Sequence, residues 1–156
     1  MRLSVLAVTA AQPGWVGEAV ADYAKRFPAE WPFTSVDLRP EKRSGNRTTA
    51  HVLAAEAERI RASLPRQSLL VVCDERGWQP TSRELAAKLA AWSLEHPAAA
   101  FVIGSADGTD PALRAQAHTV LALSRLTLPH GLAKVLLVEQ LYRAVSILKA
   151  GPYHRD

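Results

Sequence analysis

Two uninterrupted apolar runs constrain the fold of this chain more than any other feature of its sequence. Residues 69–73 and 98–103 carry only apolar side chains. A strand without alternation of polar and apolar residues is buried on both faces, as happens when helices cover both sides of a parallel sheet. The two runs therefore predict an α/β fold with a mostly parallel sheet and helices on both faces.

The rest of the chain alternates between strand and helix patterns, as such a sheet requires. Further strands are predicted at residues 3–8, 33–38 and 119–123. Helices are predicted at residues 13–26, 47–64, 81–94 and 132–148, and a short one at Pro111. Ligands of open α/β sheets bind beyond the carboxyl ends of the strands. The segments that follow Cys73, Gly104 and Leu123 are therefore expected to meet in one crevice.

The composition is that of a single globular domain, predicted to span residues 1–156. Hydrophobic residues make up 48% and charged residues 22% of the chain, and no segment approaches a transmembrane span. The apolar run near the N-terminus is interpreted as a first strand and not as a signal peptide. One cysteine, Cys73, excludes an internal disulfide and a cysteine-based metal site, so we expect a cytoplasmic protein.

Histidine spacing and net charge narrow the range of partners. His51, His96 and His118 have no potential ligands at metal-binding spacing, so no metal is predicted. The formal net charge of +4 fits a polyanionic partner, although many proteins this basic bind no nucleic acid.

Four basic residues surround the stretch 44–46, and we call them the basic loop: Arg39, Lys42, Arg43 and Arg47. A flexible basic segment is suited to RNA phosphates, which set affinity without sequence specificity. A solvated charged loop has the same pattern, so both interpretations stay open.

The last third of the chain carries the strongest functional signal. Chain ends are usually polar and frayed. Here the tail brings together a phenol, an imidazole and a guanidinium, from Tyr153, His154 and Arg155. Because such groups hold an anion or move a proton, we expect the tail to belong to a functional site.

The predicted helix at residues 132–148 is apolar on more than one face, with side chains such as Leu136, Leu137 and Val138 in succession. A helix of this kind must be covered on both sides. It is either the central helix of the core or an element that meets a second subunit, and we favour the homodimer.

Several segments together resemble one protein family: Ile103-Gly104, residues 124–131, residues 139–144 and residues 152–155. The family is RlmH, SPOUT-class methyltransferases that act on a pseudouridine of 23S ribosomal RNA, and a looser likeness covers the whole chain. The resemblance implies a C-terminal deep trefoil knot, a homodimer, and S-adenosylmethionine held by the knotted loops. It also implies N3 of pseudouridine 1915 as the target, on the assembled ribosome.

The resemblance further assigns residue roles by matching position. The implied cofactor contacts are Cys73, Gly104, Leu123, Ser124, Arg125, Leu126, Thr127 and Leu128. The implied catalytic residues are those of the tail. The N3 imide of pseudouridine must lose a proton, for which His154 is a candidate base, while Arg155 stabilises the anion. Alternatively, both side chains bind RNA and water takes the proton.

Two departures from the family pattern keep a second hypothesis open. Ser105 stands where the family usually has a glycine, and Arg125 stands where it tends to have a small residue. A non-catalytic RNA- or ribosome-binding protein with impaired cofactor binding would share the same fold. A different nucleotide-binding α/β enzyme is disfavoured, because the chain has no glycine-rich phosphate loop.

Overall fold

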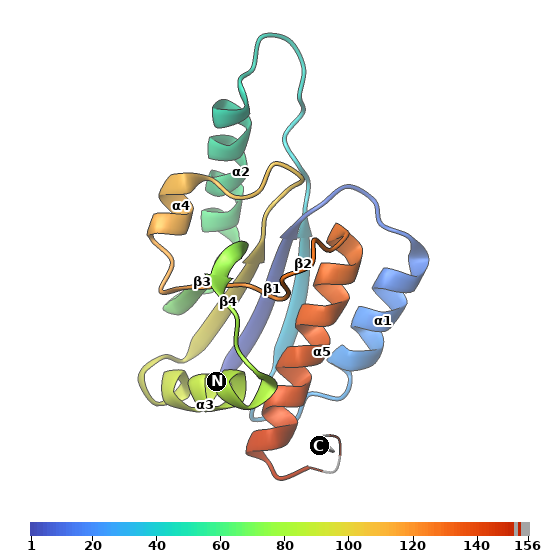
Figure 1. Cartoon of the computed structure of the whole chain (residues 1–156), viewed down its shortest axis with the longest axis vertical. Coiled ribbons are helices and arrows are strands. Elements are labelled where there is room, and N and C mark those ends of the chain that lie inside the picture. The colour runs from blue at the N-terminus through green and yellow to red at the C-terminus, as the bar shows by residue number, and fades with distance from the viewer. Residues whose placement is uncertain (152, 154–156) are drawn as a thin grey trace.

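The computed structural model describes residues 1–151 and 153 (Figure 1). Ten elements follow one another along the chain: β1 (Arg2–Val8), α1 (Gly14–Ala24), β2 (Phe33–Leu38), α2 (Thr49–Ser63), β3 (Ser68–Trp78), α3 (Ser82–Glu95), β4 (Ala98–Ile103), α4 (Pro111–Ala115), β5 (Thr119–Leu121) and α5 (His130–Leu148).

The five strands form one sheet in the order β2-β1-β4-β3-β5, and every neighbouring pair is parallel. The two apolar runs are the paired strands β3 and β4, with Val71 opposite Phe101. β4 is buried along its whole length, which confirms the prediction of a parallel sheet covered on both faces.

The helices form two layers, one on each face of the sheet. α1, α3 and α5 share a core with alternate strand residues such as Val5 and Phe101. α2 and α4 cover the other face, where Ile60 and Leu113 pack against Val102. Figure 1 shows α5 between α1 and α3, and it contacts both.

Local capping signals set several helix boundaries. Thr81 and Glu84 form the capping box that their spacing predicts. Thr81 is the N-cap, and α3 begins at Ser82. Asp110 caps α4 through the backbone N–H of Leu113, at 2.9 Å, and Pro111 occupies the first turn.

The prediction for β3 was wrong at its end, because the strand continues beyond Cys73 to Trp78. A register shift lets Leu121 pair with both Cys73 and Trp78. A Cβ atom on Gly77 would lie 2.6 Å from the Val120 carbonyl oxygen, so only glycine permits this approach. The extension is partly exposed beside the edge strand, so its polar side chains lack the apolar signal of a buried strand.

α5 is the central helix of its layer. Leu137, Leu141 and Val145 are buried between the sheet and the neighbouring helices. One chain thus covers much of the apolar surface that the sequence led us to assign to a second subunit. Leu132 and Leu148 at the two ends of α5 stay exposed. Within the described residues, none of the helices has the length and apolar character needed to cross a membrane.

Candidate active site

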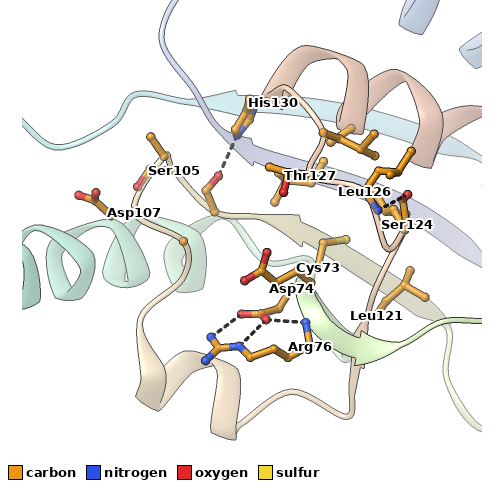
Figure 2. Close-up of a pocket in the computed structure, with 18 residues that line it drawn as sticks. Cys73, Asp74, Arg76, Ser105, Asp107, Leu121, Ser124, Leu126, Thr127 and His130 are labelled. Carbon is orange, nitrogen blue, oxygen red and sulfur yellow. Dashed lines mark hydrogen bonds and ion pairs between the residues drawn. The ribbon is translucent and has the colours of Figure 1, made fainter.

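A cavity of about 580 Å³ opens at the carboxyl ends of β3, β4 and β5 (Figure 2). The end of β3, the turn 104–108 after β4 and the loop 122–129 before α5 form its walls, as the strand ends predicted. Seven of the eight residues expected to contact a cofactor line it: Cys73, Gly104, Leu123, Ser124, Leu126, Thr127 and Leu128. Arg125 is exposed and is not among the lining residues.

One side of the cavity is apolar. Leu121, Leu123, Leu126 and Leu128 come from β5 and the loop that follows it. The loop is held in a tight turn by Ser124, whose Oγ accepts the backbone N–H of Leu126 at 2.9 Å. Leu126 is 76% exposed. A flat apolar ligand in the cavity would remove part of this leucine surface from water, which is favourable.

Gly104 directly follows β4, at the point where the chain turns back. Ser105 and Gly108 form an isolated bridge, and the Gly108 N–H donates to the Ser105 carbonyl at 2.9 Å. A Cβ atom on Gly104 would overlap the backbone carbonyl of Gly108. A glycine at a predicted cofactor contact also lets a ligand approach its backbone closely. In the structure, the turn itself already requires glycine at this position.

His130, the first residue of α5, crosses to the end of β4. Its Nε2 lies 2.8 Å from the Gly104 carbonyl oxygen (Figure 2). Because a carbonyl only accepts, Nε2 is the donor in this hydrogen bond. Both Ser105 and His130 line the cavity. Their Oγ and Nδ1 atoms are buried and have no hydrogen-bond partner among the described residues.

Asp74 lies where β3 leaves the buried part of the sheet, and its side chain is held by two arginines. Oδ1 accepts from Arg76 Nε at 3.1 Å, and Oδ2 accepts from Arg114 Nη1 at 2.8 Å. The hydrogen bonds from Arg76, followed by that from Arg114, hold the pKa of Asp74 well below its usual range. Asp74 is therefore a permanent negative charge beside the cavity.

Cys73 contributes apolar surface to the cavity and no reactive thiolate. Burial raises the pKa of its thiol to about 12. Since nucleophilic attack requires the thiolate, Cys73 is not a covalent catalyst at neutral pH.

The structure ties the basic loop to its surroundings at several points. Arg43 forms an ion pair with Asp107 of the turn 104–108, which brings the loop to the cavity rim. Arg47 forms an ion pair with Glu41. Arg39 and Lys42 have no ion pair within residues 1–151 and 153, so they are the loop cations available to a phosphate. Contact between this loop and RNA stays a prediction.

The tail residue Tyr153 is docked away from the cavity. Its hydroxyl donates to Glu139 Oε1 at 3.0 Å and lies 3.0 Å from the Tyr23 hydroxyl, while the Arg143 guanidinium lies 4.9 Å from its ring centroid. Burial, together with these hydrogen bonds, raises the pKa of Tyr153. Glu139 is nine residues past His130, or about 14 Å further along α5. Tyr153 does not line the cavity of its own chain.

The other two predicted catalytic residues, His154 and Arg155, lie outside the described residues. In the described part of the chain, no group of three or more His, Cys, Asp or Glu side chains is placed to hold a metal ion.

Comparison with known proteins defines the class to which this fold and cavity belong. The family model of the predicted SPOUT methyltransferases matches residues 1–154. A probable methylase family protein from Haemophilus influenzae shares the fold, with a TM-score of 0.55 at 17% identity over 99% of this chain and 70% of that one.

Full-length relatives narrow the class. The chain is 50% identical to ribosomal RNA large subunit methyltransferase H of Ralstonia pickettii over 99% of both chains. It is 49% identical to the protein of that name from Neisseria meningitidis, over 100% of both chains. The chain therefore belongs to the SPOUT methyltransferases and, within them, to the RlmH family, as the sequence motifs predicted.

Proposed function

We propose that this protein is a cytoplasmic, S-adenosylmethionine-dependent methyltransferase that acts on N3 of pseudouridine 1915 in 23S rRNA, on the assembled ribosome. The observation that carries the proposal is the cavity at the strand ends, lined by seven residues that match the family's cofactor contacts. Relatives that match the whole chain carry the name ribosomal RNA large subunit methyltransferase H.

The residues of the cavity fit S-adenosylmethionine. The apolar side, with Leu121, Leu126 and Leu128, suits an adenine ring. Asp74 and Asp107 also line the cavity, but both are already paired with arginines, so the apolar side is the feature that supports this cofactor. Bound there, S-adenosylmethionine would supply an electrophilic methyl group.

The acceptor imide must lose a proton, and the described residues narrow the candidates for the base. Tyr153 has a raised pKa and its hydroxyl donates a hydrogen bond to Glu139, so it is a neutral phenol at physiological pH. Cys73 is a neutral thiol. His154 is therefore the proposed proton acceptor, and Arg155 the cation that stabilises the imide anion. Tyr153 is a positioning residue that anchors the tail to α5.

We further propose that two copies combine to form each complete active site. Tyr153 is bonded to the distal half of α5, whereas the cavity lies at the beginning of this helix. The N-terminal ends of α1 and α5 lie together, since a Cβ atom on Gly131 would meet Val16. Trp15 and Leu132 stay exposed at these ends, and such large apolar residues favour a partner subunit. The tail of one subunit would then serve the cavity of the other.

The deep trefoil knot implied by the family belongs to the same proposal. It concerns the loop 122–129 and α5, the segments that build one wall of the cavity. Arg39 and Lys42 of the basic loop are the proposed phosphate contacts. Arg43 and Arg47 form ion pairs with Asp107 and Glu41.

Calorimetric titration with S-adenosylmethionine, followed by incubation with unmethylated ribosomes, tests this function. We expect saturable binding and the appearance of N3-methylpseudouridine in digested 23S rRNA, detected by mass spectrometry. A protein that binds ribosomes but neither binds the cofactor nor forms this nucleoside would be the non-catalytic alternative.

A further inference from the structure

A second hollow, of about 450 Å³, lies beside the cavity proposed to bind the cofactor. The two spaces share Asp74 and Arg76, which stand on the partly exposed end of β3. The other walls of the hollow come from α4 and β5, and none of their residues lines the cofactor cavity: Pro111, Arg114, Ala115 and Val120. The hollow is therefore a separate feature, which the proposed cofactor contacts leave unused.

The Asp74 carboxylate fixes two guanidinium groups on the wall of this hollow. Arg76 donates to both carboxylate oxygens, from Nε at 3.1 Å and from Nη2 at 3.2 Å (Figure 2). Arg114 donates from Nη1 to Oδ2 at 2.8 Å. Glu75 lines the cofactor cavity and not the hollow. Since one carboxylate faces two guanidinium groups, the hollow keeps a net positive charge.

Both arginines keep hydrogen-bond donors that the protein does not use. Within the described residues, Arg76 Nη1 and the Nε and Nη2 of Arg114 make no hydrogen bond. The side chain of Arg76 is 70% exposed and that of Arg114 is 30% exposed, so both are accessible to a ligand. Guanidinium groups with free N–H donors in a fixed geometry are suited to the oxygens of a phosphate.

The position of the hollow fits the backbone of an RNA strand. An RNA that brings one base to the cofactor cavity must place the neighbouring phosphates near the rim of that cavity. The basic loop reaches this rim through the ion pair between Arg43 and Asp107. Figure 2 shows Asp107 and Arg76 well apart along the cavity, so cations approach it from two places.

We propose that Arg76 and Arg114 bind a backbone phosphate of the RNA substrate, and that Asp74 is the positioning residue that holds both guanidinium groups in place. The inference rests on the proposed function, because it assumes that the target base enters the adjacent cavity. It adds a phosphate contact outside the basic loop. The competing interpretation is that the two arginines only brace Asp74 in the cavity wall.

The test measures the affinity for unmethylated ribosomes at several salt concentrations and the affinity for S-adenosylmethionine by calorimetry. Arg114→Gln removes the charge and keeps N–H donors for Asp74. Arg114→Lys keeps the charge and loses the planar fork. Arg66→Gln is the matched control, because it removes the same charge from an exposed residue before β3, at the opposite end of this strand from Asp74.

We expect Arg114→Gln to bind ribosomes about tenfold more weakly, the loss typical of a hydrogen bond to a charged group. The slope of the logarithm of affinity against the logarithm of salt concentration should fall by about 1, because one phosphate contact is lost. Arg114→Lys keeps this slope, and Arg66→Gln binds ribosomes like the unmodified protein. All three variants keep their affinity for S-adenosylmethionine, which shows that the cavity is intact.

An unchanged salt slope in Arg114→Gln, or an equal loss of affinity for ribosomes and for S-adenosylmethionine, would show that Arg114 only supports the cavity wall. Either result would overturn the phosphate contact and leave the proposed function standing. Conversely, a protein that forms no N3-methylpseudouridine but shows the expected salt slopes would keep the phosphate contact and lose the proposed function. Absence of ribosome binding by the unmodified protein would overturn both.

Discussion

The two halves of α5 differ in how their polar groups are satisfied. At the distal half, the Glu139 carboxylate accepts hydrogen bonds from Tyr153 and Arg143. At the first turn, His130 has one nitrogen bonded and the other unmet. Hydrogen-bonded groups hold neighbouring segments together, whereas a buried polar atom without a partner costs free energy. The comparison separates the docked Tyr153 side chain from the open cavity at the other end of the same helix.

The largest expected effect comes from a subunit-mixing experiment, which tests whether the tail of one subunit serves the cavity of the other. One variant carries Thr127→Trp, which fills the cavity from an exposed loop position. The other carries His154→Ala with Arg155→Ala. If the tail serves the partner's cavity, the inactive variants regain about a quarter of wild-type methylation when mixed, because half of the dimers are mixed and each has one complete site.

Native mass spectrometry must show that the subunits exchange. With exchange demonstrated, a mixture that stays inactive would mean that each tail serves its own cavity.

Gly104→Val probes the cavity side of the comparison. The added side chain overlaps the Gly108 backbone, so the turn must shift. We expect loss of S-adenosylmethionine binding together with a lower unfolding free energy, by about 2 kcal/mol, as for other overpacked sites. Urea denaturation and calorimetry measure the two effects.

Gly17→Ala is the control, because a Cβ atom at Gly17 has no neighbour within 4 Å. A Gly104→Val protein of unchanged stability would show that the turn tolerates a side chain and that the glycine serves the ligand alone.

Asp74→Asn tests whether Asp74 is ionised in the folded protein, through the pH dependence of the unfolding free energy. The folded-state pKa of Asp74 is lowered, so its contribution to stability is present above the unfolded pKa of about 3.9 and is lost as pH falls through the folded value. We expect the variant to be about 2 kcal/mol less stable at pH 7, the scale of hydrogen bonds to a charged group. The difference from the unmodified protein should narrow as the pH is lowered below about 4.

Urea unfolding curves at several pH values give this difference directly. If the gap between the two proteins is the same at pH 3 and pH 7, Asp74 is not held ionised by Arg76 and Arg114.

The smallest expected effect concerns the basic loop. Arg39 and Lys42 have no ion pair within the described residues, whereas Arg47 is paired with Glu41. If the loop contacts RNA phosphates, Arg39→Ala and Lys42→Ala should each reduce the salt slope of ribosome binding by about 1. Arg47→Ala should change it less. If all three variants keep the salt slope of the unmodified protein, the loop is a solvated surface segment that does not contact RNA.

Local sequence signals predicted the architecture because they act over a few residues. The apolar runs placed β3 and β4, and the spacing of Thr81 and Glu84 placed the start of α3. The same signals failed beyond Cys73, where the strand continues on polar residues that pair with the edge strand. Such pairing depends on a partner more than forty residues away, which no local pattern encodes.

The candidate site divides in the same way. The meeting of the segments after Cys73, Gly104 and Leu123 in one crevice followed from the sequence, and most of the residues that line it followed from the family resemblance. The reason for Gly104, the role of His130 and the ion pair between Arg43 and Asp107 did not. The bond between His130 and Gly104 spans 26 residues of sequence, so no local pattern encodes it.

The sequence by itself thus determined the elements, their alternation and the family of this protein, because helix caps, buried strands and motifs are written in neighbouring residues. Only the tertiary structure decided which polar groups find partners. Tyr153 reaches Glu139 and is satisfied, while Ser105 Oγ and His130 Nδ1 are buried without a partner among the described residues. The physical reason is that a hydrogen bond depends on distances of about 3 Å between atoms, and the folding of distant segments sets those distances.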